Sequence, residues 1–174
     1  MISTASGMRL PDAARVAFYH KEFVGSALGA WTQAVMRGPS DWSVGERELM
    51  AAMVARWNSC EFCIGAHRAI AIRGMTQEVV DACLADPLTA PIPERLRATL
   101  TFLEKMTKYP RELNTADAED ALRAGTSRAQ LMDAAAVAAL FNITTRYADS
   151  LKFAIPTAAE FDKSAEMMLK RGYA

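Results

Sequence analysis

Apolar residues recur along this chain at spacings of three and four, which is the period of an α-helix. In the first third of the chain, for example, Leu49, Met53 and Trp57 lie four residues apart and predict one buried helix face. Almost no stretch alternates between apolar and polar residues with the two-residue period of a strand. The pattern therefore predicts an all-α fold, in which helices pack as a bundle.

Residues that begin and end helices divide this pattern into segments. Ser43 followed by Glu46 has the spacing of a capping box. Ser59 is expected to cap the next helix, which Gly74 ends. Similar signals predict the remaining helices, which span residues 11–36 with breaks near residues 25 and 29, 76–84, 94–108, 114–123, about 127–155 and 159–170.

A length of 174 residues allows one domain with a substantial core and is short for two. We expect a single all-helical domain over residues 1–174, with a core motif at residues 43–85. The long predicted helix, about 127–155, contains five alanines between residues 134 and 139. Short side chains allow a second helix to approach closely, so this long helix is expected to lie at the centre of the bundle.

Charge and composition exclude several classes of protein. Twenty basic residues balance twenty acidic ones without a basic run, so we expect no nucleic-acid partner. The longest uncharged apolar stretch, residues 134–145, is far shorter than the ~20 residues that span a membrane, so no membrane partner is expected. Residues 1–9 lack the pattern of a secretory signal, and three cysteines do not form a disulfide scaffold. We therefore expect a cytoplasmic protein.

The segment with the clearest chemistry is Cys60-x-x-Cys63-x-x-x-His67. At ~100° per residue these three side chains share one face of a helix. Cys63 and His67 are one turn apart, close enough for a thiol and an imidazole to exchange a proton. The helix dipole favours a thiolate at Cys60, whereas the imidazole favours one at Cys63, and the residues alone leave this choice open.

A carboxylate is expected to complete this site. If the helices on either side of residues 58–59 form an antiparallel hairpin, Glu48 lies within about one turn of His67. Glu46 is explained by capping, but Glu48 has no such function. A carboxylate that orients a histidine, which in turn activates a thiol, is a common arrangement for nucleophilic catalysis.

Zinc binding is an alternative interpretation of the same residues. Cys60, Cys63, His67 and Cys83 have the donor types of a Cys₃His zinc site. Three of these ligands would have to converge from one helix face, and no second metal-binding pair follows. Cys83, between two apolar residues, is more typical of a small buried hydrophobic residue.

Glu48, eleven intervening residues and then Cys60-x-x-Cys63-x-x-x-His67, followed by Gly74, resembles the core of the alkylhydroperoxidase D-like enzymes. These enzymes form part of the carboxymuconolactone decarboxylase superfamily. The similarity covers about residues 40–85, and the later alanine-rich helix is similar to the peroxidase-related branch. One position departs from the best-studied pattern, because Phe62 stands where that pattern has a histidine.

The resemblance implies an all-helical bundle of the alkylhydroperoxidase D-like type that assembles as a homo-oligomer. It also implies peroxide reduction without a bound metal or flavin. In the family pattern the second cysteine forms the sulfenic acid, while the first donates a proton and then closes the disulfide. Carried over, Cys63 is the peroxidatic residue and Cys60 is the proton donor and resolving thiol. His67 and Glu48 would form the proton relay.

The expected function is therefore that of a thiol peroxidase acting on hydrogen peroxide or organic hydroperoxides. A dithiol of the lipoyl or thioredoxin type would act as the reductant. Phe62 implies a simpler relay, a weaker activity or a more apolar substrate. The alternatives are a dithiol–disulfide oxidoreductase and a non-catalytic helical module that responds to oxidation or zinc.

Overall fold

The computed structural model describes residues 12–18, 22 and 25–173. Over these residues the chain is all-helical, as the apolar period predicts, and contains no strand. The predicted absence of a signal in residues 1–9 and the start of the predicted helix at residue 11 lie outside the described part. The helices are α1 (Asp12–Phe18), α2 (Ser26–Arg37), α3 (Val44–Trp57), α4 (Glu61–Ala71), α5 (Gln77–Ala85), α6 (Glu94–Lys108), α7 (Thr115–Arg123), α8 (Arg128–Ser150) and α9 (Ala158–Arg171).

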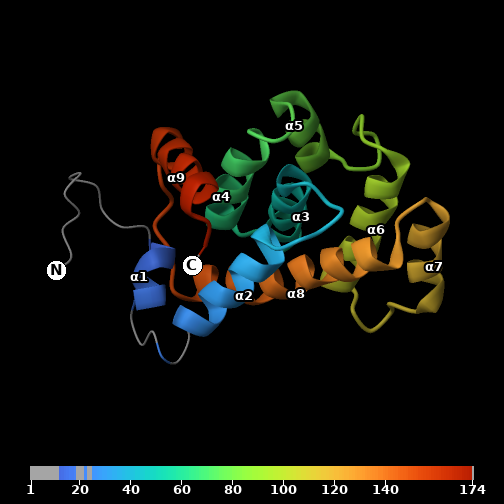
Figure 1. Cartoon of the computed structure of the whole chain (residues 1–174), viewed down its shortest axis with the longest axis horizontal. Helices are drawn as coiled ribbons and strands as arrows, with labels where there is room; N and C mark the ends of the chain where they lie inside the picture. Colours follow the sequence, from blue (N-terminus) through green and yellow to red (C-terminus); the bar gives the residue numbers. More distant parts are fainter. Residues whose placement is uncertain (1–11, 19–21, 23–24, 174) are drawn as a thin grey trace.

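Helix α3 is the most extensively buried of the described helices, and the alanine-rich helix α8 packs against α2, α3, α4, α6 and α7. Ten of the 14 residues of α3 are buried, including consecutive residues from Arg47 to Ala55. In Figure 1, α8 runs along one side of the molecule, beneath α3 and α6. Eight of its 23 residues are buried, while Met132 and Ile143 are exposed.

Capping boxes, one of them predicted from the sequence, explain where several helices begin. Ser43 and Glu46 exchange hydrogen bonds of 3.2 and 2.8 Å at the start of α3, as predicted. Ser127 and Gln130 form the corresponding box at the start of α8. The bounds of α6 agree with the predicted helix at 94–108.

Helices α3 and α4 form the antiparallel hairpin that carries the predicted site. The prediction that Ser59 caps α4 is wrong. Its backbone adopts a left-handed conformation (φ 59°) that turns the chain. Cys60 is the N-cap residue instead. At the other end of the hairpin, Gly45 and Gly74 touch, and a Cβ on either one would lie about 3.0 Å from the backbone of the other. This close contact, and not a helix end at residue 74, accounts for Gly74, since α4 ends at Ala71.

Helix α8 ends at Ser150, five residues before the predicted end near residue 155. Lys152 adopts a left-handed backbone conformation (φ 50°), and the amide of Phe153 donates to the carbonyl of Ala148. The chain thereby turns Phe153 into a small apolar cluster with Cys60 and Cys63. Burial of this aromatic ring beside the thiols stabilises the turn.

The C-terminal segment returns to the hairpin. Helix α9 packs on α4, and Phe161 of α9 lies where a Cβ on Gly65 would be. After α9, Tyr173 lies against α2 and α3, and Figure 1 shows the end of the chain beside α2. Within the described helices, none is long and apolar enough to cross a membrane.

Candidate functional site

The predicted carboxylate and imidazole are in direct contact. Nδ1 of His67 lies 2.7 Å from Oε2 of Glu48, across the α3–α4 hairpin. The Glu48 side chain is completely buried, with 0 % of its surface exposed, and His67 is also buried. The ring of Phe141 from α8 packs edge-on against the imidazole, with the ring centroids 4.3 Å apart. The hairpin therefore holds His67 in one orientation.

Electrostatics determine which atom carries the proton. Burial raises the pKa of Glu48, but the hydrogen bond and charge of His67, together with Arg37, outweigh burial and lower the pKa overall. Glu48 is therefore ionised, and an ionised carboxylate only accepts hydrogen bonds. Nδ1 of His67 must be the donor, which leaves Nε2 as the nitrogen that can exchange a proton with the thiol site.

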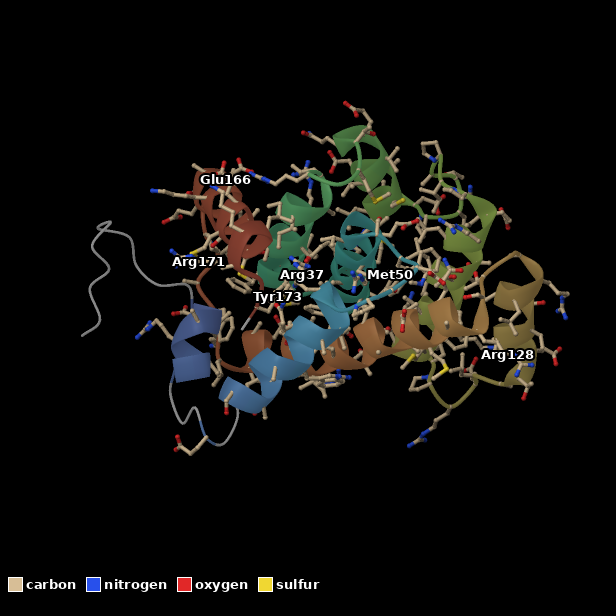
Figure 2. The ribbon with its side chains drawn as sticks, viewed as in Figure 1. Arg37, Met50, Arg128, Glu166, Arg171 and Tyr173 are labelled. Atoms are coloured by element: carbon tan, nitrogen blue, oxygen red, sulfur yellow. The ribbon has the colours of Figure 1, made fainter. Side chains whose placement is uncertain are left out.

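Two further residues bind the same carboxylate, and the sequence analysis did not identify them. Nη1 of Arg37, from the last turn of α2, donates to Oε1 of Glu48 at 2.7 Å. The Tyr173 hydroxyl donates to the same Oε1 atom at 2.9 Å. The guanidinium of Arg37 also lies over the Tyr173 ring, with Cζ 4.8 Å from the centroid, and Figure 2 shows the two side chains together beside α2. No spacing in the sequence signals these contacts, because a basic residue in a last helical turn is common.

The two thiols lie at the start of α4 and are free and buried, with 0 % of Cys60 and 1 % of Cys63 exposed. Their surroundings are apolar and aromatic. The Phe62 ring stands edge-on to Phe153 at 5.2 Å and is tilted against Phe161 at 6.2 Å. The pair therefore lies beneath a layer of phenylalanine rings.

The two thiols differ in acidity. The pKa of Cys60 is lowered chiefly by the Cys63 thiol, and the backbone amide of Cys63 acts in the same direction at the N-terminus of α4. Burial and the carboxylate of Asp149 oppose this effect. The pKa of Cys63 is raised by the same interaction with Cys60 and by burial. In the reduced pair, the Cys63 thiol therefore donates a hydrogen bond to the Cys60 sulfur, and Cys60 is the more acidic of the two.

His67 is one turn after Cys63 on α4, but no hydrogen bond joins the described imidazole to either sulfur. A proton exchange between them needs a bridging water or the substrate itself. The structure thus brings together Glu48 and His67 in one contact, and Cys60 and Cys63 in another.

Cys83 lies in a different place from the other proposed zinc ligands. It belongs to the main hydrophobic core, whereas Cys60 and Cys63 belong to the smaller cluster with Phe153. Burial raises its pKa to about 11. Over the described part of the chain, no group of three or more His, Cys, Asp or Glu side chains is arranged to hold a metal ion. The Cys₃His set is therefore not assembled in this structure.

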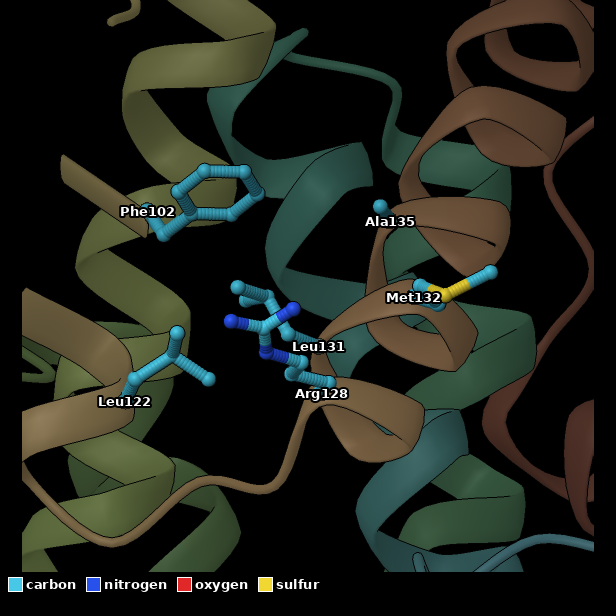
Figure 3. A pocket seen from close by; sticks show the side chains of 6 residues that line it. All are labelled: Phe102, Leu122, Arg128, Leu131, Met132 and Ala135. Atoms are coloured by element: carbon cyan, nitrogen blue, oxygen red, sulfur yellow. The ribbon is translucent and has the colours of Figure 1, made fainter. Parts of the chain in front are cut away.

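A hollow of about 330 Å³ lies between α6, α7 and α8, and Figure 3 shows its mostly apolar lining. It is lined by Phe102, Leu122, Arg128, Leu131, Met132 and Ala135. None of the predicted site residues contributes to it, so it is separate from the thiols and the relay.

The sequence matches the family model described as the carboxymuconolactone decarboxylase family over residues 24–105. This range includes the α3–α4 hairpin and all four predicted site residues. None of the curated proteins matches the sequence.

Three solved structures are similar to this chain along most of their length. An uncharacterized peroxidase-related protein from Silicibacter sp. TM1040 is 28% identical, with a TM-score of 0.79, and the match covers 87% of this chain and 78% of that one. An alkylhydroperoxidase AhpD core protein from Ralstonia eutropha JMP134, also peroxidase-related, is 29% identical, with a TM-score of 0.78 and coverages of 88% and 80%. The debrominase Bmp8, crystallised with 2,3,4-tribromopyrrole, is 18% identical, with a TM-score of 0.77 and coverages of 90% and 83%, and shares the fold.

Proposed function

We propose that this chain, which belongs to the peroxidase-related branch of the carboxymuconolactone decarboxylase superfamily, reduces hydroperoxides with the Cys60–Cys63 pair. The observation that carries the proposal is the 2.7 Å contact between buried Glu48 and His67, one helical turn after the thiols. A carboxylate that holds a histidine with Nε2 free is a suitable general base for a thiol. No bound metal or flavin is needed for this reaction.

In the first step, Cys63 attacks the terminal oxygen of the hydroperoxide. As Cys63 attacks, its proton passes through a bridging water to Nε2 of His67, which acts as the general base. A sulfur–oxygen bond forms and the oxygen–oxygen bond breaks, so that sulfur is oxidised and the peroxide is reduced. The leaving alkoxide or hydroxide takes its proton from Cys60, which is the more acidic thiol of the pair and becomes a thiolate.

In the second step, the Cys60 thiolate attacks the sulfenic acid at Cys63. A disulfide forms and hydroxide leaves, taking up the proton that His67 had accepted. The two residues are three apart at a helix start, which brings their Cα atoms within the range of a disulfide. An external dithiol then reduces the disulfide and is itself oxidised.

The surroundings of the thiols favour a small, apolar oxidant. Because both sulfurs are buried beneath Phe62 and Phe153, every reactant needs local opening to reach them, and a small hydroperoxide or a free dithiol needs less opening than a disulfide held on another protein. The aromatic layer also favours an organic hydroperoxide over hydrogen peroxide. These contacts support peroxide reduction above the alternative of direct exchange with a protein disulfide.

The test is stopped-flow oxidation of the reduced protein by hydrogen peroxide and by cumene hydroperoxide. Wild type is expected to react with both, and faster with cumene hydroperoxide. Cys63→Ser should abolish the reaction, while the matched control Cys83→Ser should leave its rate unchanged because Cys83 lies in the other core cluster. A wild-type protein that exchanges with a protein disulfide but consumes neither peroxide would support the oxidoreductase alternative instead.

A further inference from the structure

The last residues of the described chain are fastened to the relay by several specific contacts. Gly172 has a φ of 74°, a conformation that favours glycine, and a Cβ there would overlap the side chain of Gln33. The amide of Tyr173 donates to Oε1 of Gln33 at 2.7 Å. The turn after α9 thus places the Tyr173 side chain between α2 and the α3–α4 hairpin.

Tyr173 and Arg37 bind one oxygen of the Glu48 carboxylate and leave the other oxygen for His67. Both donate to Oε1, while Oε2 is left for Nδ1 of His67. The Tyr173 ring also lies nearly parallel to the imidazole, with an interplanar angle of 25° and the centroids 6.5 Å apart. A carboxylate held by two donors on one oxygen cannot rotate to offer that oxygen to the histidine.

We propose that Tyr173 is a positioning residue of the relay. Together with Arg37 it holds Glu48 so that His67 keeps a proton on Nδ1 and presents Nε2 to the thiol pair. This inference rests on the proposed function for its chemistry, but the orientation of Glu48 and His67 is a property of the folded protein that can be measured separately.

Two observations distinguish this role from ordinary packing. Arg37 and Tyr173, which come from opposite ends of the chain, both donate to Oε1 of Glu48 and leave Oε2 to Nδ1 of His67. In addition, burial and the Glu48 charge raise the pKa of Tyr173 well above its ordinary value, so that the phenol remains a donor throughout the range in which thiols titrate.

Arg37 and Tyr173 also weaken the attraction between Glu48 and a protonated imidazole. The groups that face His67 are Glu48 from α3, Tyr173 from the C-terminal segment and the apolar ring of Phe141 from α8. Arg37 from α2 acts through Glu48. Removal of a donor from Oε1 leaves more negative charge beside the imidazole, which favours its charged form.

The test uses Tyr173→Phe in the full-length chain, because this change removes only the hydroxyl. At pH 7 the rate of thiol oxidation by cumene hydroperoxide should fall about tenfold, the equivalent of one hydrogen bond to a charged group. The acid limb of the pH–rate profile should move to higher pH by up to about one unit. The ¹H–¹⁵N imidazole spectrum should show His67 changing from the Nδ1–H tautomer to a mixture with the protonated ring. Only two histidines are present, so the signals are readily assigned.

Tyr109→Phe is the matched control, since Tyr109 is exposed at the end of α6, and it should change none of these readouts. Gln33→Leu releases the turn without touching Glu48 and should shift the spectrum in the same direction by a smaller amount. If the His67 spectrum and the acid limb of Tyr173→Phe coincide with wild type, the proposal is overturned. Because the spectrum needs no turnover, a wild type that reduces no peroxide would refute the proposed function, while the imidazole signals would still decide the role of Tyr173.

Discussion

Glu48→Gln is the substitution that tests the site most directly. The glutamine has the same shape, but its amide carries a donor and an acceptor where the carboxylate has two acceptors. Its oxygen can still accept from Arg37 and Tyr173, so its NH₂ group must face His67. Nδ1 would then accept a hydrogen bond, the ring proton would move to Nε2, and the general base would be lost.

The expected rate loss is about 10²- to 10⁴-fold at pH 7, the usual contribution of a general base. The unfolding free energy should also fall, by about 3–5 kcal/mol, because Arg37 is left as a buried charge without its partner. The Arg37 side chain is only 11% exposed and lies 2.7 Å from Glu48, so little solvent screens the pair. Stopped-flow oxidation and urea unfolding of the same protein would measure the two effects.

A double variant separates catalysis from stability. In Glu48→Gln/Arg37→Met no buried charge remains unpaired, so most of the stability should return while the rate stays low. Asp81→Asn on α5 is a matched control, since it breaks the partly exposed ion pair between Asp81 and Arg68 of the hairpin. Asp81→Asn should lower the unfolding free energy by no more than about 1 kcal/mol and leave the rate of thiol oxidation unchanged. Oxidation of Glu48→Gln at the wild-type rate per folded molecule would refute a catalytic role for the Glu48 carboxylate.

The pH dependence of stability gives a second measure of the same carboxylate. The pKa of Glu48 is lowered in the folded protein, so its stabilising contribution is complete above its unfolded pKa of about 4.3. The contribution is lost as the pH falls through the lower folded value. The difference in unfolding free energy between wild type and Glu48→Gln should therefore shrink below about pH 4 and stay constant near neutral pH. A difference that grew on acidification would contradict an ionised Glu48.

The remaining predictions concern the thiols and the assembly. Peroxide should produce an intramolecular Cys60–Cys63 disulfide and leave Cys83 free, and peptide mapping that found Cys83 in the bridge would contradict the proposed site. Cys60→Ser should accumulate a sulfenic acid at Cys63 that dimedone labels, because no resolving thiol remains; labelling of Cys60 at an undiminished rate in Cys63→Ser would reverse the assignment. The half-apolar composition and the family resemblance predict a homo-oligomer, so light scattering at micromolar concentration should give a mass well above 19.0 kDa.

Local signals along the chain were sufficient to predict much of the fold. The capping box at Ser43, the helix at residues 94–108 and the helical period all act over one or two turns, so they are visible in the sequence. The Glu48–His67 contact belongs to the same group. A short turn between two helices leaves little freedom in how they align, and the helical rise then sets which residues face each other.

Contacts between distant segments could not be predicted in this way. Tyr173 meets Glu48 across 125 residues of sequence, and no period or motif connects the two. The early end of α8 has the same origin, because burial of Phe153 against the thiol cluster, and not a residue that stops helices, turns the chain at Lys152.

The acidity of the two cysteines was also decided by the tertiary structure. The spacing Cys60-x-x-Cys63 predicts that the thiols are neighbours, but not which one holds the proton. That balance depends on Cys60 being the N-cap residue of α4, on burial of Cys63 and on the nearby Asp149. Propensities and helical periods act between neighbours in sequence, whereas burial and charge depend on whatever the folded chain brings within a few ångströms.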